Sequence, residues 1–214
     1  MKILVTGGNG EFCKHLVEQG KEHSFLTPLK QSMYPGLDVR DYWNVDWYFK
    51  QKQDEFDYVI HAGAITRPMV IHEDNPTLSI KTNIVGTVNL LEAVRIVKID
   101  PIIHICSSSE VYGQVTEDDI PISEDCPLRP VSPYALSKVG EDMAAYMYYE
   151  AYGMKTIRTR MFTHTGPRRG DVFAESTFAK QIAMIEKELI PPVVKVGNLY
   201  SLRTWADVRD AVRA

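Results

Sequence analysis

The chain has 214 residues, of which 44% are hydrophobic and 24% charged, which suits one globular domain or one domain with part of a second. A net charge of −4, with basic residues dispersed except at Arg168 and Arg169, argues against a nucleic-acid partner. No apolar run approaches the roughly 20 residues of a membrane span, and the first run enters a glycine turn too early for a signal peptide. Cys13, Cys106 and Cys126 have no metal-ligand spacing, so neither a disulfide framework nor a metal site is predicted. We therefore expect a cytoplasmic protein without a membrane partner.

Strands and helices are predicted to alternate along the chain. Apolar runs predict strands at 2–6, 23–27, 57–62, 102–106 and 156–162. Amphipathic stretches predict helices at 11–20, 41–52, 76–98, 133–152 and 174–188. Strands that are apolar on both faces and alternate with helices indicate an α/β fold with a doubly wound parallel sheet of the Rossmann type. The acidic, proline-punctuated segment 113–131 is expected to be a long surface loop that serves a site.

A glycine turn joins the first predicted strand to the first predicted helix. Gly7, Gly8 and Gly10 lie where a backbone can approach a pyrophosphate, and the free amides of a helix N-terminus attract anions. Cys13 stands at the place of the usual third glycine, and Glu11 brings a negative charge near the phosphates. The turn, with a strand before it and a helix after it, predicts a dinucleotide site that includes Asn9, Glu11 and Phe12.

The ends of the next two strands bear on which dinucleotide binds. The second strand ends without the Asp or Glu that would hold an NAD ribose, and Lys30 follows it. This favours NADP, with NAD possible; the alternative is that Lys30 is a solvated loop residue. We expect His61 to be a hydrogen-bonded core or edge histidine and not a catalyst. The predicted cofactor site also includes residues that follow these strands: Asp38, Val39, Ala62, Gly63 and Ala64.

Tyr134 and Lys138 are the clearest indication of chemistry. They lie four residues apart at the start of a predicted helix and so share one face, where an ammonium can lower the pKa of a phenol. A hydroxyl from Ser107–Ser109, at the end of the fourth strand, could hold the substrate oxygen that Tyr134 protonates or deprotonates. Tyr48 and Lys52 repeat the spacing without a serine run upstream, and we interpret them as a packed tyrosine and a solvated lysine.

These segments belong to a set of motifs that runs along the whole chain: TGGNG, HAGA, TNIVGTVNLLEA, SSSEVYG, SPYALSK and GNLYSLRTWADVRDAV. The set resembles the extended short-chain dehydrogenase/reductase family that acts on nucleotide sugars. Within that family the chain looks most like GDP-mannose 4,6-dehydratase and its close relative, GDP-4-keto-6-deoxy-mannose reductase. The resemblance implies a dinucleotide-binding domain over 1–162 and the beginning of a smaller sugar-nucleotide domain over 163–214, which we expect to be truncated.

The resemblance also implies roles for single residues. The implied catalytic set is Ser108, Glu110, Tyr134 and Lys138. Asn83 and Arg168 would join the cofactor site, Arg168 from a loop that in the dehydratase reaches a neighbouring subunit's cofactor. The implied substrate-binding residues are Thr163, Lys195, Asn198 and Arg203, with Thr163 standing where the relatives carry an asparagine. The implied partners are a sugar nucleotide and further copies of the chain, as a dimer or tetramer.

Four activities would use this set differently. In a dehydratase acting on GDP-mannose, Tyr134 takes the C4 hydroxyl proton as hydride passes to NADP, Glu110 takes the C5 proton, and hydride returns to C6 as water leaves. A 4-keto-sugar reductase needs only Ser108, Tyr134 and Lys138, and Glu110 would then merely cap nearby amides. A C4 epimerase would keep a tightly bound NAD, and a truncated module would bind a dinucleotide without turnover. The dehydratase is the leading prediction, with the base of the sugar nucleotide left open.

Overall fold

The computed structural model describes residues 1–28, 36–52, 56–66 and 76–214. The chain forms two compact units, Met1–Met161 and Phe162–Ala214. Their assignment as cofactor and substrate regions stays a prediction. Lys30 lies outside the described residues.

The first unit contains a parallel sheet whose strands follow the order β2-β1-β3-β4-β5. Its strands are β1 (Lys2–Thr6), β2 (Ser24–Leu26), β3 (Tyr58–His61), β4 (Ile102–Cys106) and β5 (Thr156–Thr159). The strand order reverses direction between β1 and β3, which is where ligands bind in doubly wound sheets. The predicted parallel sheet is confirmed. The strand predicted over 156–162 ends earlier, because β5 stops beside the last residue of its partner β4, Cys106 opposite Thr159.

Helices follow the strands, as the sequence predicted. They are α1 (Glu11–Gln19), α2 (Tyr42–Gln51), α3 (Thr77–Ser79), α4 (Gly86–Val97) and α5 (Pro133–Tyr152), with short 3-10 segments η3 (Ser109–Tyr112) and η4 (Glu117–Asp119). The helix expected over 76–98 is interrupted by a π-helical segment, η2 (Ile80–Val85). Such segments are often found at functional sites, and this one carries Asn83.

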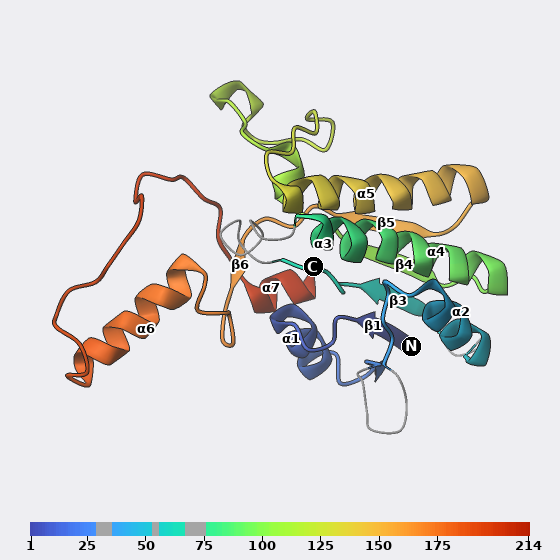
Figure 1. Cartoon of the computed structure of the whole chain (residues 1–214), viewed down its shortest axis with the longest axis horizontal. Helices are drawn as coiled ribbons and strands as arrows, with labels where there is room; N and C mark the ends of the chain where they lie inside the picture. Colours follow the sequence, from blue (N-terminus) through green and yellow to red (C-terminus); the bar gives the residue numbers. More distant parts are fainter. Residues whose placement is uncertain (29–35, 53–55, 67–75) are drawn as a thin grey trace. The chain divides into compact units, whose positions relative to one another are not determined.

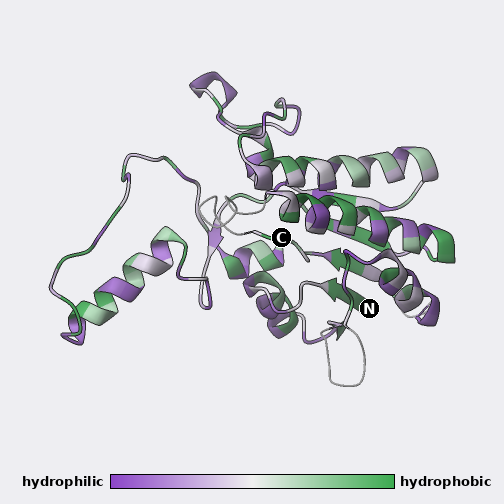
Figure 2. Ribbon diagram, viewed as in Figure 1, coloured by the Kyte–Doolittle hydropathy of each residue, from purple (hydrophilic) through white to green (hydrophobic). Residues whose placement is uncertain are grey.

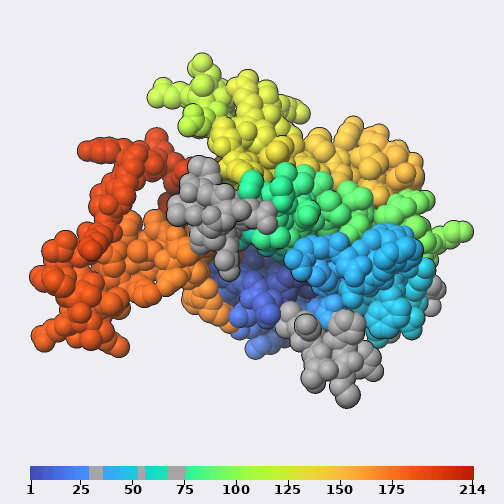
Figure 3. Space-filling view, in the orientation of Figure 1, coloured from blue at the N-terminus to red at the C-terminus, as the bar shows by residue number. Residues whose placement is uncertain are grey.

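The two faces of the sheet bury separate hydrophobic clusters, because side chains alternate along each strand. On one face, Leu4 and Val59 pack with α2, α4 and α5, and Tyr48 joins this core as expected. On the other face, Ile3, Val5 and Ile60 pack with α1. Figure 1 shows the helices around the sheet. Helix α4, which packs in the first of these clusters, is largely hydrophobic (Figure 2) and lies beside α2 (Figure 3). Both faces are therefore covered, and the carboxyl ends of the strands are left for a site.

The second unit is small. It contains β6 (His164–Thr165), α6 (Ala174–Glu186), β7 (Ala206–Asp207) and α7 (Val208–Arg213), and β6 pairs in parallel with β7. Val208 is its one buried residue. Across the described residues of both units, none of the helices has the length and apolar character needed to cross a membrane.

Candidate active site

The glycine turn is held tightly against the end of β3. The Gly10 amide donates to the Gly7 carbonyl at 2.8 Å, and Gly7 has a φ of +74°, in the left-handed region. A Cβ on Gly7 would lie 2.7 Å from the Ala62 carbonyl oxygen and 2.8 Å from the Gly63 Cα. Gly10 contributes no side-chain cap to α1, and the N-terminus of a helix attracts anions through its dipole. This cradle fits the pyrophosphate of a dinucleotide.

The substitution at Cys13 is accommodated in the core. Cys13 is 1% exposed, and burial raises the pKa of its thiol to about 11, so it stays protonated. The side chain of Phe12, a predicted cofactor residue, packs against the same cluster. Of the other predicted cofactor residues, Val39 is buried, and Asp38 holds the Arg40 guanidinium with oxygen distances of 2.9 and 2.6 Å. That hydrogen bonding lowers the pKa of Asp38, so its carboxylate is ionised and already paired.

His61 is the centre of a buried chain of neutral hydrogen bonds. The Gly63 amide donates to Thr6 Oγ1 at 3.0 Å, and Thr6 Oγ1 lies 2.7 Å from His61 Nδ1. His61 Nε2 lies 3.1 Å from Thr87 Oγ1, which itself donates to the Asn83 carbonyl at 2.7 Å. Because the Thr87 hydroxyl proton is already donated to the Asn83 carbonyl, Thr87 Oγ1 must accept from His61 Nε2–H. His61 Nδ1 therefore carries no proton and accepts from the Thr6 hydroxyl. Burial lowers the pKa of His61 to about 3, so His61 is a neutral core histidine, as expected.

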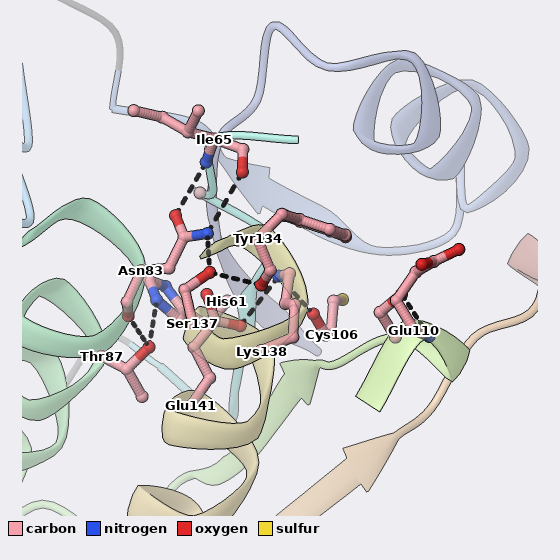
Figure 4. Close-up of polar contacts among 12 residues, drawn as sticks. His61, Ile65, Asn83, Thr87, Cys106, Glu110, Tyr134, Ser137, Lys138 and Glu141 are labelled. Atoms are coloured by element: carbon pink, nitrogen blue, oxygen red, sulfur yellow. Dashed lines mark hydrogen bonds and ion pairs between the residues drawn. The ribbon is translucent and has the colours of Figure 1, made fainter. Parts of the chain in front are cut away.

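Asn83 ties the loop after β3 to the catalytic helix. Its side chain accepts from the Ile65 amide at 2.8 Å and donates to the Ile65 carbonyl at 3.1 Å and to Ser137 Oγ at 2.9 Å (Figure 4). Ser137 Oγ in turn donates to the Tyr134 carbonyl at 2.7 Å. In the same loop the Ala64 amide donates to the Ala62 carbonyl at 3.0 Å. The Asn83 side chain thus links the loop after β3 to the backbone of Tyr134 through Ser137. The sequence analysis did not identify Ser137.

Lys138 is fixed beneath Tyr134 on α5. The helix begins as predicted, with Ser132 Oγ accepting from the Ala135 amide at 3.0 Å and Pro133 at the first position. Lys138 Nζ lies 5.8 Å from the centre of the half-buried Tyr134 ring. The Lys138 side chain is 3% exposed, and its ammonium donates to the Cys106 carbonyl at 2.9 Å and to Glu141 Oε2 at 2.8 Å. The predicted pair is therefore brought together.

Burial of the Tyr134 phenol outweighs the predicted effect of Lys138 on its pKa. Burial of the phenol raises its pKa above the usual value. The Lys138 ammonium lowers it, as the sequence suggested, and so does the hydrogen bond of the Ser108 hydroxyl, but the charges of Glu141 and Glu110 add to the effect of burial. Burial depends on tertiary packing, which the spacing of Tyr134 and Lys138 does not reveal.

Ser108 and Glu110 lie where β4 leads into η3. Ser108 is 8% exposed, and its Oγ accepts from the Glu110 amide at 3.2 Å. Ser108, and not Glu110, thus caps this turn. Glu110 is exposed, points away from Lys138 in Figure 4, and among the described residues its carboxylate accepts no hydrogen bond. It is nevertheless close enough to raise the pKa of Tyr134.

A second ion pair on α5 anchors the loop over 113–131. Asp142 is fully buried and accepts from Arg158 at 2.9 Å and from Arg160 at 2.9 and 3.2 Å. Arg160 also donates to the Tyr112 hydroxyl at 3.0 Å and to the Glu124 carbonyl at 2.8 Å. The loop that follows the serine strand is therefore fastened to α5 through Arg160.

Five further predicted residues belong to the second unit: Thr163, Arg168, Lys195, Asn198 and Arg203. The Thr163 carbonyl accepts from the Ala206 amide at 3.0 Å. The Lys195 backbone is held by the Gln181 side chain, at 2.7 and 3.0 Å. Their roles in binding substrate or cofactor stay predictions.

Comparison with known sequences points to one family. A family model described as GDP-mannose 4,6 dehydratase matches residues 30–214. The chain is 34% identical over 214 residues to GDP-6-deoxy-D-mannose reductase of Pseudomonas aeruginosa, covering 100% of this chain and 68% of that protein. It is 35% identical over 238 residues to GDP-mannose 4,6-dehydratase of Yersinia enterocolitica, covering 99% of this chain and 62% of that protein. The chain thus spans only part of the length of these relatives.

Solved structures agree with this fold. The structure of RMD from Pseudomonas aeruginosa complexed with NADPH superposes with a TM-score of 0.87 at 27% identity, covering 99% of this chain and 71% of that one. Thermus thermophilus UDP-glucose 4-epimerase in complex with NAD gives a TM-score of 0.79 at 27% identity, covering 100% of this chain and 72% of that one. By sequence and fold, the chain belongs to the GDP-mannose 4,6 dehydratase family of NAD-dependent epimerase/dehydratase enzymes, as its motifs predicted.

Proposed function

We propose that the chain forms the cofactor-binding and catalytic part of a nucleotide-sugar 4,6-dehydratase that converts GDP-mannose to GDP-4-keto-6-deoxy-mannose. The observation that carries this proposal is the set of groups that act on the Tyr134 phenol: the Ser108 hydroxyl, the Lys138 ammonium and the Glu110 carboxylate. A reductase needs the first two partners. A dehydratase also needs a base for the C5 proton, and Glu110 offers an exposed carboxylate at the same strand end.

The cofactor that we propose is NADP, held by the glycine turn of Gly7, Gly8 and Gly10 and by the start of α1. Gly7 lets this turn pack directly against the end of β3, because a Cβ there would lie 2.7 Å from the Ala62 carbonyl oxygen, and a glycine turn between a first strand and a first helix is where a pyrophosphate binds in folds of this kind. Two relatives are consistent with this class of cofactor, since one was solved with NADPH and another with NAD. When bound, NADP would supply a hydride acceptor and donor.

Each catalytic side chain would then have a separate task. Ser108 would hold the C4 oxygen of the sugar, and Tyr134 would take the proton from it. Glu110 would take the proton from C5, which becomes acidic once C4 is a ketone. The atoms would balance: the proton that Glu110 takes from C5 would leave with the C6 hydroxide as water, the proton that Tyr134 takes from the C4 hydroxyl would be given back at C5, and the hydrogen removed from C4 would end on C6.

Lys138 would make the ionisation of Tyr134 possible. Burial disfavours the phenolate, so the opposing ammonium is needed to stabilise it, and Lys138 Nζ lies 5.8 Å from the ring centre. Because Tyr134 starts with a raised pKa, we expect C4 oxidation to speed up as the pH rises. The measurement is the initial rate of C4 oxidation against pH, and a rate that falls over the same range would contradict this role.

The experiment that tests the activity is incubation of a full-length version with GDP-mannose and no added reductant. The dehydratase is expected to form a 4-keto product, which is followed by mass and by its carbonyl absorbance. Glu110→Gln should lower turnover by roughly 100-fold or more, as for a lost general base, while C4 oxidation persists. Glu117→Gln is the matched control, because Glu117 lies in η4, and we expect it to leave turnover unchanged. Unchanged conversion in Glu110→Gln would exclude Glu110 as the base.

A 4-keto-sugar reductase is the second candidate. It is favoured by the 34% identity to GDP-6-deoxy-D-mannose reductase and by the TM-score of 0.87 with RMD. A reductase would consume NADPH in a one-to-one ratio with a 4-keto sugar nucleotide and would leave GDP-mannose untouched. That outcome would replace the dehydratase proposal.

We also propose that the protein is a homo-oligomer. On α5, Leu136, Met143 and Met147 are 48%, 38% and 44% exposed and lie seven and four residues apart, so they share one helix face. A contiguous apolar face of this kind is typical of a protein interface. The cytoplasmic location expected from the sequence remains a prediction.

A further inference from the structure

Lys138 forms an ion pair that the proposed reaction does not use. Glu141 Oε2 accepts from Lys138 Nζ at 2.8 Å, and the two side chains are 1% and 3% exposed (Figure 4). The other carboxylate oxygen of Glu141, Oε1, is buried and has no hydrogen-bond partner among the described residues. A buried charge with an unsatisfied oxygen costs stability and is a poor way to strengthen a fold. Its position beside Tyr134 and Lys138 suggests another use.

Tight packing keeps this carboxylate away from water. Glu141 follows Gly140, where an added Cβ would lie only 2.4 Å from Ile84 Cδ1, so α5 approaches η2 very closely. On a helix, Glu141 and Tyr134 lie on opposite sides of Lys138 along the axis, three residues beyond it and four before it. The Lys138 ammonium is therefore held between a carboxylate on one side and a phenol on the other.

The donors of Lys138 can be counted. An ammonium has three N–H groups. One donates to the Cys106 carbonyl at 2.9 Å and one to Glu141 at 2.8 Å. Within the part of the chain that the structure describes, the third has no other acceptor, and it is left for Tyr134 and for the oxygen of a bound ligand.

We propose that Glu141 is a positioning residue of the catalytic pair, which holds the Lys138 ammonium so that its third N–H faces Tyr134. This inference rests on the proposed catalytic role of Tyr134 and Lys138. It assigns Glu141 no contact with substrate or cofactor. Its effect passes through Lys138 in two ways. The hydrogen bond from Lys138 to Glu141 fixes the orientation of the ammonium, and the negative charge of Glu141 partly neutralises the positive charge that Tyr134 experiences.

The charge effect has a definite sign. A negative charge beside the pair raises the pKa of both Lys138 and Tyr134, and Glu141 acts on each in this direction. Burial raises the pKa of Glu141 itself to about 7, against the pull of Lys138. Removing the carboxylate should therefore lower both pKa values and move the working pH range down.

The other titratable groups packed around Lys138 are neutral or already paired, so Glu141 is the principal negative charge next to the ammonium. Cys106 on β4 is a neutral thiol, because burial raises its pKa, and His61 on β3 is neutral. Asp142 on α5 is paired with two guanidinium groups. Glu110 on η3 also raises the pKa of Tyr134, but a substitution at position 141 does not remove its charge.

The test is a titration of Tyr134 in protein free of cofactor and substrate. Carbon-13 NMR of tyrosine labelled at Cζ reports each phenol, and Tyr134→Phe identifies the signal. In Glu141→Gln, whose amide oxygen can still accept from Lys138 so that only the charge is removed, the midpoint is expected to fall by about 1 pH unit, the usual effect of one close charge. Glu92→Gln is the matched control, since Glu92 also bonds a cation three residues ahead, Arg95 at 2.6 Å, and it should not move the Tyr134 signal.

An unchanged or raised midpoint in folded Glu141→Gln would overturn the proposal. If that variant does not fold, Glu141→Asp withdraws the carboxylate by one methylene, and a smaller fall is expected; no change there would equally overturn it. The pH profile of turnover should shift down in parallel. Since the titration needs no substrate, its result is independent of whether the enzyme proves to be a dehydratase or a reductase.

Discussion

Asp142→Asn tests the buried ion pair that fastens the loop to α5. The side chain of Asp142 is 0% exposed, and its two guanidinium partners, on Arg158 and Arg160, are 31% and 16% exposed. Removing one partner of a buried ion pair typically costs about 3–5 kcal/mol. Because both guanidinium groups retain some contact with water, we expect a loss near the lower end, about 3 kcal/mol in the free energy of unfolding.

The matched control is the exposed pair of Asp100 and Lys155, whose side chains are 69% and 56% exposed. Asp100→Asn should cost no more than about 1 kcal/mol. Urea unfolding followed by circular dichroism measures both variants. Equal losses in the two variants would refute the idea that burial decides the strength of these pairs.

The Asp142 pair also predicts a dependence on pH. Burial alone would raise the pKa of Asp142, but the hydrogen bond and charge of Arg160 and the charge of Arg158 outweigh it, and the net pKa is lowered. A lowered carboxyl pKa contributes stability that is present above the unfolded value, 3.8, and is lost as the pH falls through the folded value. The difference between wild type and Asp142→Asn should therefore shrink in acid, and a constant difference would contradict this account.

Three further predictions concern the cofactor cradle, the choice of cofactor and the assembly. Gly7→Ala should destabilise the fold by about 1–3 kcal/mol in urea, because its Cβ would lie 2.7 Å from the Ala62 carbonyl at a positive φ. Gly10→Ala, with a Cβ 3.3 Å from the Gly7 carbonyl, should cost much less, and equal costs would contradict the strain argument. Lys30→Ala should weaken NADP binding roughly tenfold in calorimetry and leave NAD unchanged, as for one lost charge-assisted contact; equal loss for both would exclude Lys30. Met147→Glu should shift the protein toward the monomer in sedimentation, and an unchanged mass would rule out this face.

Local patterns in the sequence predicted most of the first unit. Hydrophobic periodicity in the sequence located the strands of the parallel sheet and the helices that cover it, because these elements turn one face or both toward the core. The pair of Tyr134 and Lys138 was found because their spacing of four residues is itself a helical distance. Ser132 and Pro133 marked the start of that helix through their capping chemistry.

What the sequence could not reveal depends on packing between distant segments. Lys138 and Glu141 are three residues apart, which on a helix normally indicates an exposed ion pair. They are buried because Gly140 lets α5 approach Ile84 of η2, a contact between segments more than fifty residues apart. The raised pKa of Tyr134 has the same origin, since desolvation follows from the neighbours that the fold supplies.

The loop after β3 has a consequence for how a ligand can lie across the sheet. Three successive amides, of Gly63, Ala64 and Ile65, already donate to Thr6 Oγ1, the Ala62 carbonyl and the Asn83 side chain. This stretch can accept hydrogen bonds through its carbonyls but has no N–H to offer an anion. This difference would orient a bound dinucleotide. Its phosphates would lie over the backbone amides that follow β1, and its hydroxyl or amino groups, which can donate hydrogen bonds, would lie over the carbonyls that follow β3.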